Sequence, residues 1–178
     1  QTRRPIADYL GPIGYTVVGG TEAWEVLDDN PPDDGTYIDP PAGPVPPDPI
    51  PRVGLAFGTT TQPADHRRHR LRFSLRGWSD LGPSHRVEAT LFFGVHRWTQ
   101  RFTYNNLTPT LLTGTWRTCP PELVGLVSAG IAGEITAVID PGGSPLQAMV
   151  SEAYIDIDYR ARPTYAGVTY EGGVPTTL

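Results

Sequence analysis

Glycine and proline interrupt this sequence so often that few long regular elements can form. Forty of its 178 residues are Gly or Pro, about 22%, where average usage would give about 12%. Because both residue types favour turns and end regular elements, the surplus predicts many short elements joined by turns. That organisation is typical of an all-β sandwich or barrel and unfavourable for a helical bundle.

Apolar and polar residues alternate in several segments, as they do in strands with one buried face. In residues 70–76 the apolar side chains share one face and the arginines share the other. Residues 87–93 and 96–104 alternate in the same way and are separated by two residues, which predicts two neighbouring antiparallel strands. Further strands are expected over residues 20–27, 36–38, 131–139 and 147–159, and one short helix over 120–129.

The two ends of the chain lack this periodicity. Residues 1–20 and 163–178 are rich in Gly and Pro, so we expect extended N- and C-terminal arms around a β-sandwich at 21–162, which contains a stiff proline-rich connector at 39–51. The sandwich has enough apolar positions to close without the arms, which are therefore expected to contact partners. The partner-binding candidates are Arg3, Arg4, Ile6, Tyr9, Leu10, Tyr165 and Tyr170.

Composition excludes several other classes of protein. The formal net charge of −5 argues against a dedicated nucleic-acid binder, whose domain usually has a basic excess. The sequence contains no run of 18 apolar residues, so no membrane-spanning helix is expected. The first residues do not look like a secretory signal. The single cysteine, Cys119, excludes an internal disulfide.

An acidic segment supplies candidate calcium ligands. Asp28, Asp29, Asp33 and Asp34 lie close together, and calcium binds several carboxylate oxygens. Their spacing does not match an EF-hand, and two prolines interrupt it. Aspartates also make turns through their own side chains, and this interpretation is preferred. No metal or other cofactor is therefore assigned.

Two charged faces are expected to satisfy each other. Arg70, Arg72 and Arg76 lie on one side of the strand at 70–76, and Glu152, Asp156 and Asp158 lie on one side of the strand at 147–159. Pairing between these faces, or with a neighbouring subunit, requires no nucleic acid. The segment 66–69 contains two histidines, which is half a zinc site at most, and is interpreted as a solvated loop.

Catalytic signatures are missing from the sequence. It contains no Gly-x-Ser-x-Gly elbow, phosphate loop or HExxH motif, so a non-enzymatic role is expected. Trp78, in a Gly-rich corner, is the candidate for stacking on a glycan, although tryptophans in sandwiches are more often part of the core.

Several short stretches resemble a family of bacteriophage virion β-sandwich proteins. They are residues 3–8, 24–29, 32–38 and 150–159, together with Trp116-Arg117-Thr118 ahead of the expected helix. The resemblance implies a jelly-roll-like sandwich whose first and last strands lie close together. It also implies a virion structural protein, either a minor tail component or a capsid decoration or fibre-base protein.

The partners implied are other virion proteins, as a homo-oligomer or with major capsid or tail proteins. The alternative from another class is a carbohydrate-binding or adhesion module that recognises host surface glycans. An exposed aromatic platform would favour that alternative.

Overall fold

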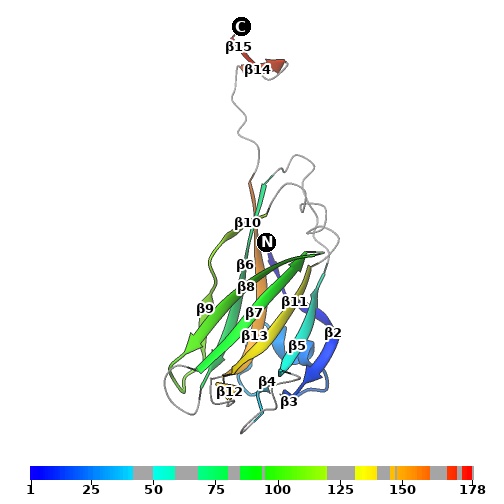
Figure 1. Cartoon of the computed structure of the whole chain (residues 1–178), viewed down its shortest axis with the longest axis vertical. Helices are drawn as coiled ribbons and strands as arrows, with labels where there is room; N and C mark the ends of the chain where they lie inside the picture. Colours follow the sequence, from blue (N-terminus) through cyan, green and yellow to red (C-terminus); the bar gives the residue numbers. More distant parts are fainter. Residues whose placement is uncertain are drawn as a thin grey trace.

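Two antiparallel β-sheets pack face to face in the computed structural model of the chain (Figure 1). The structure describes residues 1–41, 50–58, 68–79, 85–93, 95–119, 131–139, 145–146, 148–160, 168–171 and 174–177. The protein is therefore an all-β antiparallel sandwich, as the Gly and Pro content and the alternation predict.

The first sheet has seven strands and is built around two long central strands, β6 (Arg68–Trp78) and β13 (Met149–Arg160). These two strands pair along their whole length, with one register shift between Val150 and Glu152. Shorter strands complete both sides of the sheet: β1 (Thr2–Arg3), β3 (Thr16–Val18), β4 (Tyr37–Asp39), β9 (Thr110–Thr113) and β10 (Arg117–Cys119).

The second sheet has six strands, and its main path runs β2-β5-β11-β7-β8. Strands β2 and β8 therefore form its two opposite edges. The members are β2 (Pro5–Ile13), β5 (Arg52–Phe57), β7 (His85–Phe93), β8 (His96–Tyr104), β11 (Ile131–Ile139) and the two-residue β12 (Pro145–Leu146). Strands β14 (Val168–Glu171) and β15 (Val174–Thr177) pair with each other and with no other strand of the described residues.

The inward faces of both sheets form one apolar core. Leu71 and Leu75 of β6 are fully buried, as are Leu55 of β5 and Ile135 of β11. The rings of Phe57 and Phe73 meet edge to face across the two sheets, with centroids 5.6 Å apart. Burial of apolar side chains of this size contributes about 1.5–3 kcal/mol each.

Most strand predictions are confirmed. The segments 36–38, 70–76, 87–93, 96–104, 131–139 and 147–159 correspond to β4, β6, β7, β8, β11 and β13. Strands β7 and β8 pair in one continuous antiparallel register from His85–Tyr104 to Phe93–His96. The helix expected over 120–129 and Tyr165 lie outside the described residues, as do residues 42–49 of the connector expected at 39–51.

The strand expected over 20–27 is wrong, because residues 23–27 form a helix, α1 (Ala23–Leu27). Three of its residues, Ala23, Val26 and Leu27, are buried, and this i, i+3, i+4 spacing marks a helical face. Glu22 and Glu25 form a capping box at its start. Within the described part of the chain, no helix is long and apolar enough to cross a membrane.

A carboxylate from β2 caps the first turn of α1. The Asp8 side chain of β2 accepts the backbone N–H groups of Ala23 and Trp24, at 3.0 and 2.9 Å. These donors have no partner within the helix. The helix thus depends on a contact distant in sequence, which local alternation cannot reveal.

The division of residues 1–20 as an arm is also wrong, because this segment belongs to both sheets. Strand β1 pairs with β13, β2 with β5 and β3 with β4. Gln1 and Ile157 exchange two backbone hydrogen bonds, of 2.8 and 2.7 Å. Strands β1 and β3 are short, and β2 contains three register shifts, so no alternating pattern identifies them. The first and last strands of the sandwich do lie side by side.

Candidate functional site

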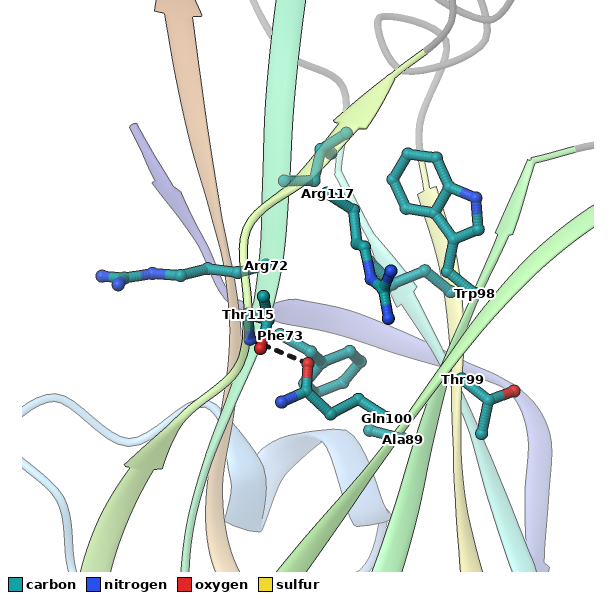
Figure 2. Close-up of a pocket in the computed structure, with 10 residues that line it drawn as sticks. Arg72, Phe73, Ala89, Trp98, Thr99, Gln100, Thr115 and Arg117 are labelled. Carbon is teal, nitrogen blue, oxygen red and sulfur yellow. Dashed lines mark hydrogen bonds between the residues drawn. The ribbon is translucent and has the colours of Figure 1, made fainter.

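The two sides of the sandwich are closed differently. Next to β2, helix α1 packs against β2, β4 and β13 and fills the gap with buried side chains. On the opposite side β8 faces the β9–β10 segment, where the Gln100 side-chain oxygen accepts the backbone N–H of Thr115 at 2.9 Å (Figure 2). Beyond that hydrogen bond, the described residues leave a groove between β8 and β10. We call this opening the β8–β10 mouth, formed by Arg97, Trp98, Thr99, Arg117 and Thr118.

The mouth is a groove of about 490 Å³ that is wide open to solvent. A smaller cavity of about 20 Å³ continues inward from it, between Phe73, Leu91 and Gln100. That inner space can hold about one water molecule. A ligand of any size would therefore have to occupy the outer groove.

Strand register places an arginine and a tryptophan at this opening. Arg117 is the direct partner of Leu71, a fully buried residue, and paired residues of antiparallel strands project to the same face. Trp98 is likewise the partner of the buried Leu91. Figure 2 shows the Arg117 side chain directed between the sheets beside Trp98, whereas Arg72 points away from them.

The arginines of the mouth differ from the arginines that form ion pairs among the described residues. Arg4, Arg70, Arg72, Arg76 and Arg101 each form an ion pair with an aspartate or glutamate. Among the described residues, neither Arg97 nor Arg117 has an acidic partner within ion-pair distance. Arg117 projects to the inward face and is exposed, whereas Arg97 precedes the inward Trp98 on β8 and so projects to the outer face. One guanidinium group therefore faces the groove.

The outer face of the first sheet has the charge pairing expected from the sequence. Arg72 pairs with Asp156 at 2.8 Å, and Arg70 pairs with Asp158. The Trp116 ring lies beneath both guanidinium groups, 5.2 Å from that of Arg70 and 4.5 Å from that of Arg72. These contacts make the Arg70–Arg72 surface internally neutral.

Arg76 and Glu152, which face each other on the two central strands, do not pair with each other; each pairs with another residue. Arg76 lies opposite Glu152 in the register but pairs with Asp34 at 2.7 Å, while Glu152 pairs with Arg4 at 2.7 Å. The acidic segment and the N-terminal strand therefore both attach to the outer face of the first sheet.

The four calcium candidates do not converge on one point. Asp29 accepts a hydrogen bond from the Thr36 hydroxyl, Asp33 from the backbone N–H of Gly35, and Asp34 from Arg76 and Ser151. Burial, followed by the charge of Asp29, raises the pKa of Asp28. No group of three metal-ligating side chains occurs within the described residues. The segment is a turn whose carboxylates mostly bind protein groups.

The Trp78 ring is half-buried and meets Tyr37 edge to face, with centroids 5.0 Å apart. Its stacking on a glycan remains a hypothesis. Trp98 lines the β8–β10 mouth instead. The sequence feature that indicates this opening is Gln100, a polar residue at an inward position of the strand at 96–104.

The partner-binding candidates of the N-terminal segment separate into two groups. Arg4 is engaged by Glu152, and Arg3 lies in the strand paired with β13. In contrast, Ile6 and Tyr9 of β2 are 59% and 49% exposed. Leu10 is half-buried, and the side chain of Tyr170 lies outside the described residues.

A serine–histidine pair offers no accessible nucleophile. The Ser79 hydroxyl hydrogen-bonds to Nδ1 of His85, an arrangement that can activate a serine. Ser79 is only 1% exposed, so a substrate could not reach it. The pair joins the end of β6 to the start of β7.

Comparison with known proteins places the chain in no family. No family model matches the sequence, and no curated protein matches it. One matching solved structure is a carbohydrate-binding module in complex with β-1,4-galactotriose, with 8% sequence identity and a TM-score of 0.35. The match covers 81% of this chain and 88% of that one. A similarity at this level supports no inference about function.

Proposed function

We propose that this chain is a non-enzymatic structural protein of a bacteriophage particle, a minor tail component or a capsid decoration or fibre-base protein. It would act in the virion by assembling with other subunits, as a homo-oligomer or with capsid or tail proteins. The observation that supports this proposal is the exposed apolar surface of the edge strand β2. The family resemblance of the sequence motivates the choice of particle.

Strand β2 has the properties of an assembly edge. Among the described strands it pairs with β5 alone, and an unpaired strand edge is a template for contact with another chain. Ile6 and Tyr9 project from it and are more than 40% exposed. Large apolar side chains on such an edge favour a protein partner, because association removes them from water.

The strand is also held in a fixed position before any partner binds. Tyr9 and Leu10 pack so closely on Gly54 that a Cβ atom there would lie 2.7 Å from each. The Asp8 carboxylate fixes the helix start. Assembly through β2 would therefore require little ordering of the chain, which lowers the entropic cost of association.

A charge-insertion experiment tests the proposal. The double variant Ile6→Glu/Tyr9→Glu places two carboxylates on the β2 edge, and Val95→Glu/Leu107→Glu is its matched control at exposed apolar positions, 95% and 70% exposed, outside β2. Sedimentation of the purified chain and incorporation into particles by complementation are measured for both. We expect the β2 variant to lose self-association or incorporation by at least tenfold and the control to retain both.

Equal incorporation of both variants would overturn the proposal. The melting temperature of each variant shows whether a loss of incorporation results from unfolding. If the double variant melts more than a few degrees below the control, the single variant Ile6→Glu, at the more exposed position, replaces it.

A further inference from the structure

The last two strands of the chain form a hairpin outside both sheets of the sandwich. Strand β14 pairs with β15 along its whole length, and neither pairs with any other strand of the described residues. A two-stranded hairpin by itself is at best marginally stable in water, and a third strand or a packed face is needed to stabilise it. A strand edge that accepts the hairpin would therefore stabilise it.

Strand β8 is the edge best suited to accept a further strand. Its nine residues contain neither Gly nor Pro and pair with β7 in one continuous register. No described strand pairs with its other side, and a regular edge of this kind is a template for strand addition. The opposite edge, β2, is interrupted by Pro5, Gly11, Pro12 and three register shifts, which oppose continuous backbone pairing. Strand β2 can therefore contact a partner through its side chains but is a poor template for a ladder.

Within the hairpin, β14 is the strand that can join such an edge. It contains no proline, whereas β15 contains Pro175. Because proline within sheets is confined to edge strands, β15 would remain at the outside and β14 would lie next to the accepting strand. The sequence therefore specifies which side of the hairpin pairs.

We propose that the β14–β15 hairpin of one copy of the chain adds to β8 of a second copy, with β14 antiparallel to β8 and Glu171 opposite Arg97. Arg97 is exposed on the outer face of the six-stranded sheet and forms no ion pair among the described residues. Opposite charges directly across two antiparallel strands stabilise their pairing. Glu171 is the one acidic residue in the sequence of the hairpin, so the charge of Arg97 selects the register.

The same register suits the neighbouring position. Tyr170 stands opposite Trp98, and aromatic pairs across strands are favourable. Trp98 is half-buried and packs against the core, so Tyr170 would extend the inner face of the sheet by one strand. It would then cover part of the β8–β10 mouth, where Arg117 projects from the other sheet. Tyr170, a partner-binding candidate in the sequence, thereby gains a defined place in an interface.

Other registers fit less well. A shift of two residues in either direction puts Glu171 opposite an uncharged residue. A shift of four puts it opposite Arg101, but that arginine already pairs with Glu88 at 2.6 Å. Next to it, the Gln100 side chain binds the backbone N–H of Thr115 and joins β8 to the other sheet. The first residues of β8, in contrast, border the open mouth, where an added strand has room.

The partner is a second copy because both halves of the match lie on this chain, and the hairpin and β8 of one copy do not pair with each other. The two surfaces differ, so the contact is heterologous, and such contacts close into rings or continue as filaments. The inference goes beyond the assembly proposed for β2 and does not depend on it, because β2 and β8 are opposite edges of the six-stranded sheet.

Charge reversal on full-length chains tests the contact. All chains carry Ile6→Glu/Tyr9→Glu, so that β2 does not contribute, and the chain with these substitutions alone is the parent. Arg97→Glu blocks the accepting strand, and Glu171→Arg blocks the hairpin. Sedimentation velocity over a concentration series should show that each variant alone self-associates about fivefold or more weakly than the parent. An equal mixture of the two should regain association, because each hairpin then meets a β8 strand of opposite charge.

A matched control separates this contact from a general effect of charge. Arg52→Glu makes the same change of charge at an exposed position of the same sheet, on β5, and should leave association unchanged. Tyr170→Ala should weaken association, because the pair with Trp98 is lost. The melting temperature of each variant shows whether a lost association results from unfolding.

Failure of the mixture to regain association would overturn the inference, as would a parent that stays monomeric at every concentration. If the native chain associates and the parent does not, the β2 proposal alone is supported. If the parent is monomeric but the β14 amides resist hydrogen exchange until Arg97→Glu is introduced, the hairpin occupies β8 of its own copy and the second-copy assignment is wrong. Association that survives the β2 substitutions and responds to both charge reversals would support this contact, whatever the outcome for β2.

Discussion

Arg4 and Glu152 are 148 residues apart in the sequence and form an ion pair in which Nη2 and Oε1 are 2.7 Å apart. The Glu152 side chain is only 5% exposed. The same guanidinium donates hydrogen bonds to the backbone carbonyls of Asp28 and Asp29, at 3.3 and 2.7 Å. One side chain thus joins the N-terminal strand, the last strand of the sandwich and the acidic turn.

Removal of this guanidinium should destabilise the fold substantially. Arg4→Ala would leave the Glu152 carboxylate buried without its partner and two carbonyls without a donor, for an expected loss of about 2–4 kcal/mol in the free energy of unfolding. Arg101→Ala, which breaks the more exposed pair with Glu88, should cost less than about 1 kcal/mol. Urea denaturation of both variants checks the difference, and equal losses would contradict it.

Deletion of residues 1–18 tests the corrected boundary of the sandwich. The deletion removes β1, β2, β3 and the Asp8 carboxylate at the start of α1. We expect an insoluble product or one whose melting temperature is at least 15 °C lower, because β5, β13 and α1 lose their neighbours. A truncated chain that melts within a few degrees of the full chain would restore the interpretation of this segment as an arm.

Protonation of Asp34 should lower the stability of the protein in acid. Hydrogen bonds from Arg76, opposed by burial and reinforced by Ser151, lower the pKa of the Asp34 carboxyl below its ordinary value of 3.8. A lowered pKa means that the unfolded state binds more protons, so this contribution is complete above pH 3.8 and is lost as pH falls through the lower pKa.

The variant Asp34→Asn removes that contribution. It should be less stable than the native chain at pH 6, and the difference should shrink as the pH approaches 2. Asp33→Asn is the control from the same turn, because Asp33 has no arginine partner among the described residues. Denaturation at a series of pH values measures both, and a difference that does not change with pH would contradict the assignment.

Gly77 should not tolerate a side chain. A Cβ atom there would lie 2.4 Å from the backbone oxygen of Met149, so the two central strands would have to separate. Gly77→Ala should lose more than about 2 kcal/mol of unfolding free energy. Gly11→Ala is the control, because nothing lies within 4 Å of the corresponding position, and a change within about 0.5 kcal/mol is expected there.

Alternation alone predicts the central strands and one surface of this protein. It predicts β6 and β13, and the pairing of Arg70 and Arg72 with Asp158 and Asp156 follows from the charged faces of those strands. Long central strands are predictable because each has a buried and a solvated face.

The edges of the sandwich are not predictable in this way. Helix α1 starts on a carboxylate from another strand, and β1 and β3 are too short for a period to appear. The β8–β10 mouth depends on which strands end each sheet, since Arg117 and Trp98 come from different sheets. Pairing order is a tertiary property, and the local sequence around either residue does not contain it.

The placement of β2 and β8 on opposite edges has a consequence for an assembled array. If copies associate through β2, the strand at the other end of the sheet, β8, stays outside the junction. Each subunit would then still present the β8 edge to a further chain, and a strand edge is a template for such pairing. Association at one edge would therefore leave a second, different surface available to another partner.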